Sequence, residues 1–448
     1  MGKFYDMHMH AFDLSHPNLV SFLFRDDLFD KIPNRKIRKI SLLGPVGLLL
    51  PGLIKKGLKK IIEENLYIKN TLSFYEIPIE YQFLLVDYFL KSPDNPLDKI
   101  VETNNEFVVD GETCNKIVLC PLSIDFGYKN IDQSGVFYNK APQKPIAKQI
   151  GDLFLSINTY YRFELSPGDY AQKLQLKEIK KPLDEIKQDK LFEIYPFMGL
   201  NTQNYTLDKL KGTASETGLL DKYFSEFSNS ESPETRRQRL YAKMGSFDGK
   251  MYEDDGSIYK NIFTGIKVYP QLGFDPLPET SNQQEREKVE FLYEYCIARR
   301  IPIIAHCSDG GFKSGNFDKL TNPALSWKKV IEKYPELTLC LAHFGHQKTG
   351  ATDWQKTIIG LTKAENIYTD ISCNDSNDAY YKQLNNVLKT SGDNLSRKVL
   401  FGSDFSINMY ASKVSSYNQY LNTFIHTGAL ENKKDLFFTN PEKFLFGN

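Results

Sequence analysis

The second half of the sequence repeats one pattern, in which a short apolar run is followed by a segment with apolar residues at helical spacing. From residue 261 onward this pattern predicts strands at 262–269, 301–305, 337–342, 367–371 and 399–401, and helices at 283–300, 324–334, 379–390 and 436–446. Strands that alternate with helices in this way form βαβ units and therefore a parallel sheet. This alternation is the strongest constraint on the fold.

The first half adds three predicted strands, at residues 3–9, 116–124 and 191–198. Eight strands with helices between them predict the α/β class and a closed (β/α)8 TIM barrel. We expect one such barrel to span residues 1–448. Two insertions, 20–110 after the first strand and 202–258 after the third, lengthen its loops.

Composition and charge exclude several classes of partner. The chain has 56 basic and 56 acidic residues, so no positive excess favours nucleic acid or an anionic membrane. Its six cysteines are scattered and predict free thiols, and with an N-terminus that lacks a signal-like apolar run they predict a cytoplasmic protein. Residues 42–54 are apolar but too short for a membrane span, and we expect them to form a buried loop and helix over the barrel.

Six residues with metal-binding or acid–base chemistry lie in the predicted strands or directly after them: His8, His10, Lys267, His306, His343 and Asp404. The C-terminal ends of barrel strands meet on one face, so these side chains should converge. His8 and His10 are two residues apart and point to the same side of their strand. Neutral imidazoles with a carboxylate suit zinc, and also manganese, iron or nickel. The sequence therefore predicts a metal site.

The ordered motifs DMHMH, GIKVYP, IIAHCS, LAHFGH and LFGSDF resemble the amidohydrolase superfamily of metal-dependent barrel hydrolases. They look most like its amidohydrolase-related branch, family 2, which contains hydrolases and aromatic-acid decarboxylases. The resemblance implies that His8, His10, His306 and Asp404 bind a metal ion. It also implies that His343 contacts a second ion or polarises the substrate. Ser406 stands where relatives often have proline, which does not affect the ligands.

Lys267 matches a lysine that some members of the superfamily carboxylate to bridge two metal ions. A salt bridge inside the barrel explains a lysine at this position equally well. The number of ions, one or two, therefore stays open. Lys267 also argues against the related metal-dependent DNases, which place a glutamate on this strand.

The function implied by the resemblance is hydrolysis of an amide, ester or lactone bond in a small organic molecule by water that a metal ion activates. Asp404 would take the proton from that water, and His343 would stabilise the oxyanion. The alternatives are a metal-dependent decarboxylase of an aromatic or unsaturated carboxylic acid and, outside enzymes, a metal-binding scaffold protein. A homo-oligomer is compatible with the sequence.

Other residues near the predicted strand ends have simpler explanations. His16 and His346 are predicted to be solvated loop residues near the mouth of the barrel. Cys307 follows His306 and should point away from it, as a buried thiol. Gly310 and Gly311 suit either a turn or a close approach of backbone to a substrate.

Overall fold

The computed structural model describes residues 2–13, 77–93, 99–102, 104–125, 146–167, 174–246, 263–312, 318–411, 414 and 416–447. Residues 42–54 and His16 lie outside the described residues. So does the larger part of the predicted insertion 20–110, together with residues 247–258 of the second one.

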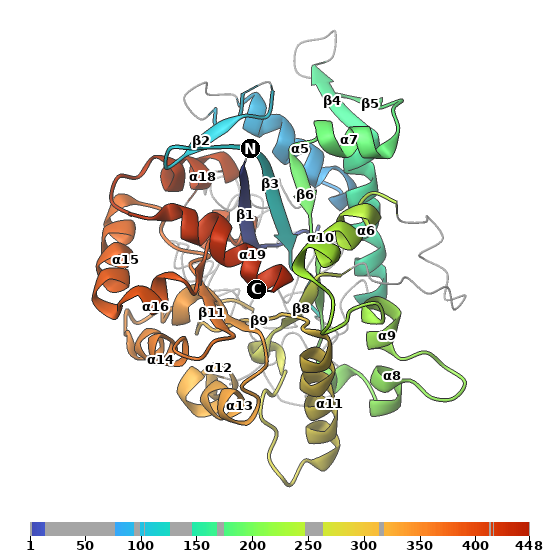
Figure 1. Ribbon diagram of the computed structural model, residues 1–448, viewed down its shortest axis with the longest axis vertical. Helices are drawn as coiled ribbons and strands as arrows, with labels where there is room; N and C mark the ends of the chain where they lie inside the picture. The colour runs from blue at the N-terminus through green and yellow to red at the C-terminus, as the bar shows by residue number, and fades with distance from the viewer. Residues whose placement is uncertain are drawn as a thin grey trace, which may run out of the picture.

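The strands of the described chain form two larger sheets and one hairpin (Figure 1). The first sheet has the order β1-β3-β2 with β6 also paired to β3, and β1, β3 and β6 are parallel. The second has six strands in the order β12-β11-β10-β9-β8-β7, all parallel. The strands are β1 (Gly2–Met9), β2 (Phe107–Val109), β3 (Glu112–Pro121), β4 (Phe163–Pro167), β5 (Leu174–Glu178), β6 (Phe192–Ile194), β7 (Phe197–Gly199), β8 (Gly265–Val268), β9 (Ile303–Ala305), β10 (Leu339–Leu341), β11 (Ile367–Asp370) and β12 (Val399–Leu400).

Isolated parallel bridges connect the first sheet to both ends of the second, at β7 and just after β12. Met9, the last residue of β1, bridges to Phe405, which follows β12. Leu122, which follows β3, bridges to Phe197 of β7. The backbone also links β1 to the segment after β12, because the Met7 amide donates to the Phe401 carbonyl over 3.0 Å.

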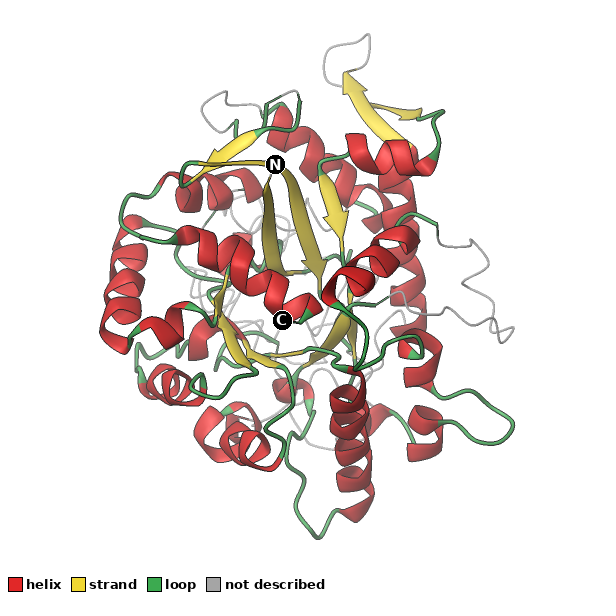
Figure 2. Cartoon of the chain, viewed as in Figure 1, coloured by secondary structure: helices red, strands yellow, loops and turns green. Residues whose placement is uncertain are grey.

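Helices surround these strands on the outside (Figure 2). Within the described residues, none of the helices combines the length and apolar character that a membrane span requires. The helices are α5 (Ile79–Lys91), α6 (Ile146–Arg162), α7 (Leu183–Asp189), α8 (Leu207–Lys211), α9 (Leu219–Phe224), α10 (Pro233–Lys243), α11 (Gln283–Arg299), α12 (Asp318–Thr321), α13 (Lys328–Lys333), α14 (Asp353–Leu361), α15 (Asp378–Ser391), α16 (Asp393–Ser396), α17 (Ile407–Ala411), α18 (Tyr417–His426) and α19 (Asn440–Phe446).

The element types predicted for the second half are confirmed, with boundaries shifted by a few residues. In the first half, the strand predicted at 191–198 is two short strands, β6 and β7, separated by Tyr195 and Pro196. Proline has no amide hydrogen to donate to a ladder, so the strand is interrupted there. The chain then changes sheets, because β6 pairs with β3 whereas β7 pairs with β8.

The sequence did not predict α6 or the β4–β5 hairpin. α6 packs against α5, and its residues Phe154, Ile157 and Tyr160 are fully buried. The described part of the predicted insertion 202–258 contains α8, α9 and α10, with a loop between α9 and α10 at residues 225–232. That loop, SEFSNSES, is rich in serine.

The strands carry the polar residues of interest into an apolar interior. All of β1 from Phe4 to Met9 is buried, and so are β8, β9, β10 and β11 throughout. Strands that are buried on both faces read as continuous apolar runs, as the predicted strands do. A polar side chain on such a strand has to be satisfied by partners inside the protein.

Candidate metal centre

His8, His10 and Asp404 bring their donor atoms together at the end of β1. His10 Nε2 lies 3.1 Å from Asp404 Oδ1, and His8 Nε2 lies 3.6 Å from the same oxygen. The two imidazole rings are 5.4 Å apart between centroids. All three residues are buried, and their donor atoms lie within 4.8 Å of one another. The structure thus brings together three of the six residues that the sequence singles out.

The backbone places Asp404 against β1. The Asp404 amide donates to the His8 carbonyl over 2.6 Å, and the His10 amide donates to the Phe405 carbonyl. Asp404 has a φ of 56°, in the left-handed region that non-glycine residues rarely occupy. Two backbone hydrogen bonds, to the end of β1 and to the residue after it, therefore hold the carboxylate at the imidazoles, at the cost of local backbone strain.

His306 and His343 form a second pair just after the neighbouring strands β9 and β10. His343 Nε2 lies 3.0 Å from His306 Nδ1, and His306 Nε2 lies 3.1 Å from the carbonyl oxygen of Gly310. Because a carbonyl oxygen only accepts, His306 Nε2 is the donor in that contact. Lys267, on β8, lies between the two pairs, with Nζ 3.4 Å from His8 Nε2.

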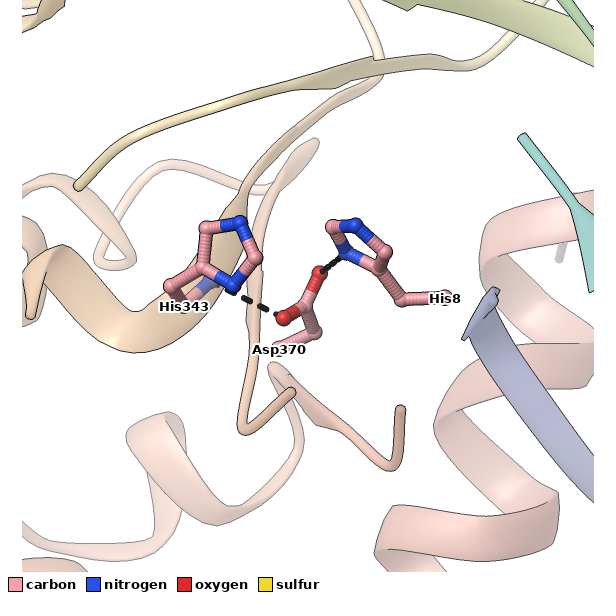
Figure 3. Close-up of side chains that lie close together, drawn as sticks. All are labelled: His8, His343 and Asp370. Carbon is pink, nitrogen blue, oxygen red and sulfur yellow. Dashed lines mark hydrogen bonds and ion pairs between the residues drawn. The ribbon is translucent and has the colours of Figure 1, made fainter. Parts of the chain in front are cut away.

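Asp370 and Ser372 join the site without having been predicted from the sequence. Asp370 is the last residue of β11, and its Oδ2 lies 2.9 Å from His8 Nδ1. Figure 3 shows its carboxylate between His8 and His343, where Oδ1 accepts from the His343 amide over 2.9 Å. The Ser372 hydroxyl contacts Asp370 and lies 2.9 Å from His343 Nδ1.

The signal for Asp370 was present in the sequence. The strand-end argument that singled out His306 and His343 applies equally to the segment IYTDIS, which follows the same rhythm. Ser372 gives no such signal, because serine after a strand is typical of any turn.

Burial controls the charges of these groups. It lowers the pKa of His8 to about 3, aided by the positive charge of Lys267. It also lowers the pKa values of His306 and His343, so these imidazoles are neutral near pH 7. Burial alone would raise the pKa of Asp404, but its contacts with His10 and the other nearby histidines outweigh burial and hold that pKa below its usual value. Burial lowers the pKa of Lys267 to about 8.

A cavity of about 390 Å³ opens directly onto the site. His10, His306, His343 and Asp404 form its polar floor. Its walls include four residues with aromatic or cationic side chains, Tyr269, Phe312, Tyr380 and Lys348. The Tyr269 ring stacks on His306, with 4.1 Å between the ring centroids and 10° between the planes. Cavities of this size hold small organic molecules.

The structure also places the residues for which the sequence gave simpler explanations. His346 is exposed and lines the cavity mouth. Cys307 is fully buried and its Sγ faces the Thr321 carbonyl, as expected for a thiol that points away from the site. Gly311 lines the cavity, so its backbone is close to whatever occupies that space.

Comparison with known proteins gives one family match. Residues 260–447 match the family model described as Amidohydrolase. No curated protein matches the chain. The matched residues include Lys267, His306, His343 and Asp404, and they leave out His8 and His10.

Several solved structures show weak likeness. An uncharacterized TIM-barrel protein from Bordetella bronchiseptica is 16% identical, with TM-score 0.29, over 49% of this chain and 64% of its own. Amidohydrolase 2 from Bifidobacterium longum subsp. infantis is 17% identical, with TM-score 0.29, over 41% of this chain and 61% of its own. The chain thus spans less than two thirds of both proteins.

A third structure, 2,6-dihydroxybenzoate decarboxylase from Rhizobium, is 10% identical, with TM-score 0.37, over 99% of each chain. Likenesses of this strength establish no shared activity. The family match over residues 260–447 confirms that the chain resembles the amidohydrolase superfamily, as its motifs predict.

Proposed function

We propose that the protein is a metal-dependent hydrolase that uses water to cleave an amide, ester or lactone bond in a small organic molecule. The site would be built on a closed (β/α)8 barrel, in which β1, β3, β6–β7 and β8 to β12 occupy the eight strand positions. The bridges Met9–Phe405 and Leu122–Phe197 support this closure, because they join the first sheet to both ends of the second.

The arrangement of His10 and Asp404 is the observation that carries the proposal. His10 Nδ1 lies 2.8 Å from the Leu122 carbonyl oxygen, which only accepts, so this nitrogen is the donor. A neutral His10 then turns the lone pair of Nε2 toward the Asp404 carboxylate, 3.1 Å away. Two electron-rich atoms at this distance repel each other unless a cation lies between them.

The donor set fits a divalent ion in type and spacing. Zinc takes imidazole nitrogen and carboxylate oxygen at ~2.0–2.2 Å in a tetrahedron, whose edges are then roughly 3.3–3.6 Å. The distances of 3.1 and 3.6 Å from Asp404 Oδ1 to the two Nε2 atoms are close to such edges. Zinc is our first choice, and manganese, iron and nickel accept the same ligands.

A count of protons extends the argument to His306 and His343. Four contacts run in a row from the Gly310 carbonyl through His306, His343 and Ser372 to Asp370. Both ends are acceptors, and the three groups between them carry only three protons when both imidazoles are neutral. One contact therefore lacks a proton, and a cation near the His306–His343 pair would supply the missing charge.

The residues of this chain would then have separate roles in catalysis. A bound divalent ion lowers the pKa of water and polarises a substrate carbonyl. Asp404, ionised and at the cavity floor, is placed to take a proton from the attacking water and to pass it to the leaving group. His343 also lines the cavity, and its Nε2 proton, which faces His306 Nδ1 in this structure, would turn to the oxygen that becomes negative.

The test begins with metal analysis of the purified protein beside the variant His8→Ala/His10→Ala. Wild type should carry at least one equivalent of a divalent ion and the variant none. The variant Lys389→Ala, whose side chain is exposed on α15, is the matched control and should keep the metal. Equal metal content in wild type and the double histidine variant would contradict the site.

A substrate screen then separates the reactions. Esters, lactones and amides of small acids are incubated with the metal-loaded protein, and hydroxybenzoates are tested in parallel. Hydrolysis that disappears in the histidine variant is the expected result. Release of carbon dioxide without hydrolysis would identify a decarboxylase instead, and a metal-loaded protein with neither activity would favour a scaffold.

A further inference from the structure

We infer that Asp370 is a positioning residue, whose carboxylate keeps the His8 proton on Nδ1 and so turns the Nε2 lone pair toward Asp404. The inference deepens the proposed function and rests on it in one respect, namely that an ion binds at His8 Nε2. Asp370 itself would not bind the ion.

Two contacts on opposite sides of the His8 ring assign the same proton position. Asp370 Oδ2 lies 2.9 Å from Nδ1, and an ionised carboxylate only accepts, so Nδ1 donates. Lys267 Nζ lies 3.4 Å from Nε2, and an ammonium group only donates, so Nε2 accepts. All three side chains are almost fully buried, so water does not compete for these contacts.

The other oxygen of the same carboxylate anchors the loop that carries His343. Asp370 Oδ1 accepts from the His343 amide over 2.9 Å and from the Ser372 amide over 3.0 Å. His343 has a φ of 61°, a left-handed conformation that is unfavourable for histidine. One carboxylate from β11 thus orients a ring on β1 and holds a strained residue after β10 (Figure 3).

An alternative role for Asp370 is to bind an ion of its own. His8, His343 and Asp370 also lie within 4.8 Å of one another through one donor atom each. The contacts favour the positioning role, because both carboxylate oxygens already accept hydrogen bonds. Oδ1 accepts from two backbone amides, and Oδ2 faces His8 Nδ1. An ion at this position would have to displace these donors.

The variant Asp370→Asn tests the role because it preserves the shape of the side chain while it turns one acceptor into a donor. Its amide oxygen can keep the two backbone donors, so the loop of His343 stays anchored. Its amide nitrogen then faces His8 Nδ1 and donates to it. The His8 proton is thereby forced onto Nε2, the nitrogen that would bind the ion. Partners that orient metal-binding histidines typically contribute 10–100-fold to metal affinity.

The experiment reads the His8 proton directly and needs no activity. Nitrogen-15 NMR of metal-free protein labelled at its seven histidines distinguishes Nδ1–H from Nε2–H rings. The His8 signal is assigned by its loss in His8→Gln. We expect Nδ1–H in wild type and Nε2–H in Asp370→Asn. Zinc competition with a chromophoric chelator should show about 10–100-fold weaker binding for Asp370→Asn.

The control is Asp87→Asn, which changes a buried carboxylate outside the site. Asp87 accepts from the Tyr160 hydroxyl over 2.7 Å, and the variant should leave both zinc affinity and the His8 signal unchanged. Wild-type affinity in Asp370→Asn, or loss of one whole equivalent of zinc from two in Asp370→Ala, would overturn the inference.

The wild-type spectrum decides the question even if Asp370→Asn fails to fold, because a His8 proton on Nε2 would also overturn the inference. Wild-type protein that binds no divalent ion would contradict the proposed function. The spectrum of the metal-free protein would still decide the role of Asp370.

Discussion

The site has two groups of metal-binding side chains, which we call its first wall, at β1 and β12, and its second wall, after β9 and β10. The ring nitrogens of the two walls find their partners in different ways. On the wall of β1 and β12, His10 is held by the Leu122 carbonyl, a group outside the cluster, and its remaining lone pair faces Asp404. On the wall of β9 and β10, His306 and His343 face each other at 3.0 Å. One proton, on His343 Nε2, can satisfy the contact between these two rings, so the contact that lacks a proton falls elsewhere in the row that ends at Asp370. The first wall has no such arrangement and keeps its repulsion until a cation binds. The first wall should therefore determine metal affinity, and the second should adjust it.

The largest effect is expected from Asp404→Asn, which removes the carboxylate of the first wall. The amide keeps the shape of the side chain but loses its charge and its ability to take a proton. General acid–base groups contribute about 10²–10⁴-fold to rate, so kcat/KM for the substrate found in the screen should fall by about that factor. The assay is run at saturating metal. A loss below about tenfold would show that another group moves the proton.

The next effect compares one histidine from each wall. His10→Gln should weaken zinc binding by more than about 100-fold, and His306→Gln by about 10–100-fold, the range of groups that act around a metal site. Chelator competition measures both, and unfolding in urea checks that both variants are folded. The reverse order of the two affinities would show that the ion is held by β9 and β10 instead.

Sequence reasoning predicted the first wall better than the second. The two-residue period of one strand predicts that His8 and His10 point to the same side. The place of Asp404 after the last strand predicts that it lies near them, so local sequence patterns were sufficient to predict this wall. The contact of His306 with Gly310 depends on a loop conformation, which residue types do not determine. Pro196 and Asp370 are intermediate cases, because each carried a local signal that the periodicity of the apolar residues concealed.

The accuracy with which the sequence predicts helices and strands also differs along the chain. The strands after residue 263 and the helices α11, α13, α15 and α19 follow a regular period and were predicted with shifts of a few residues, whereas α14 and α18 were not predicted. α6 was not predicted. It packs against α5, which comes from a distant part of the chain, and that contact exists only in the folded protein. The charge states of Lys267 and His8 likewise depend on burial and neighbours that only the folded chain defines.

A smaller effect on the second wall is expected from Gly311→Ala. Gly311 has a φ of +81°, and a Cβ there would lie 2.2 Å from the Tyr269 hydroxyl oxygen and 2.9 Å from His306 Cε1. The matched control is Gly350→Ala, with a φ of +75° and no atom within 4 Å of the added Cβ. Gly350→Ala should cost about 1–2 kcal/mol of unfolding free energy from conformation alone. Gly311→Ala should cost about 1–3 kcal/mol more, because the crowded ring pair must move. An equal loss of unfolding free energy in the two variants, measured by urea denaturation, would show that the Tyr269–His306 stack moves without a measurable energetic penalty.

The smallest effect is expected from the charge of Lys267, which lies between the two walls. Burial lowers the pKa of Lys267 from 10.5 to about 8, although Asp370 and Asp404 oppose the shift. Between pH 8 and 10.5 the unfolded chain therefore holds a proton on this lysine that the folded chain has lost, so its contribution to stability rises with pH. The unfolding free energy of metal-free wild type, relative to Lys267→Met, should rise by about 1 kcal/mol per pH unit across that window. Lys389→Met, at an exposed position, should show no such slope. A difference that stays constant from pH 7 to 10 would mean that Lys267 keeps its proton in the folded protein.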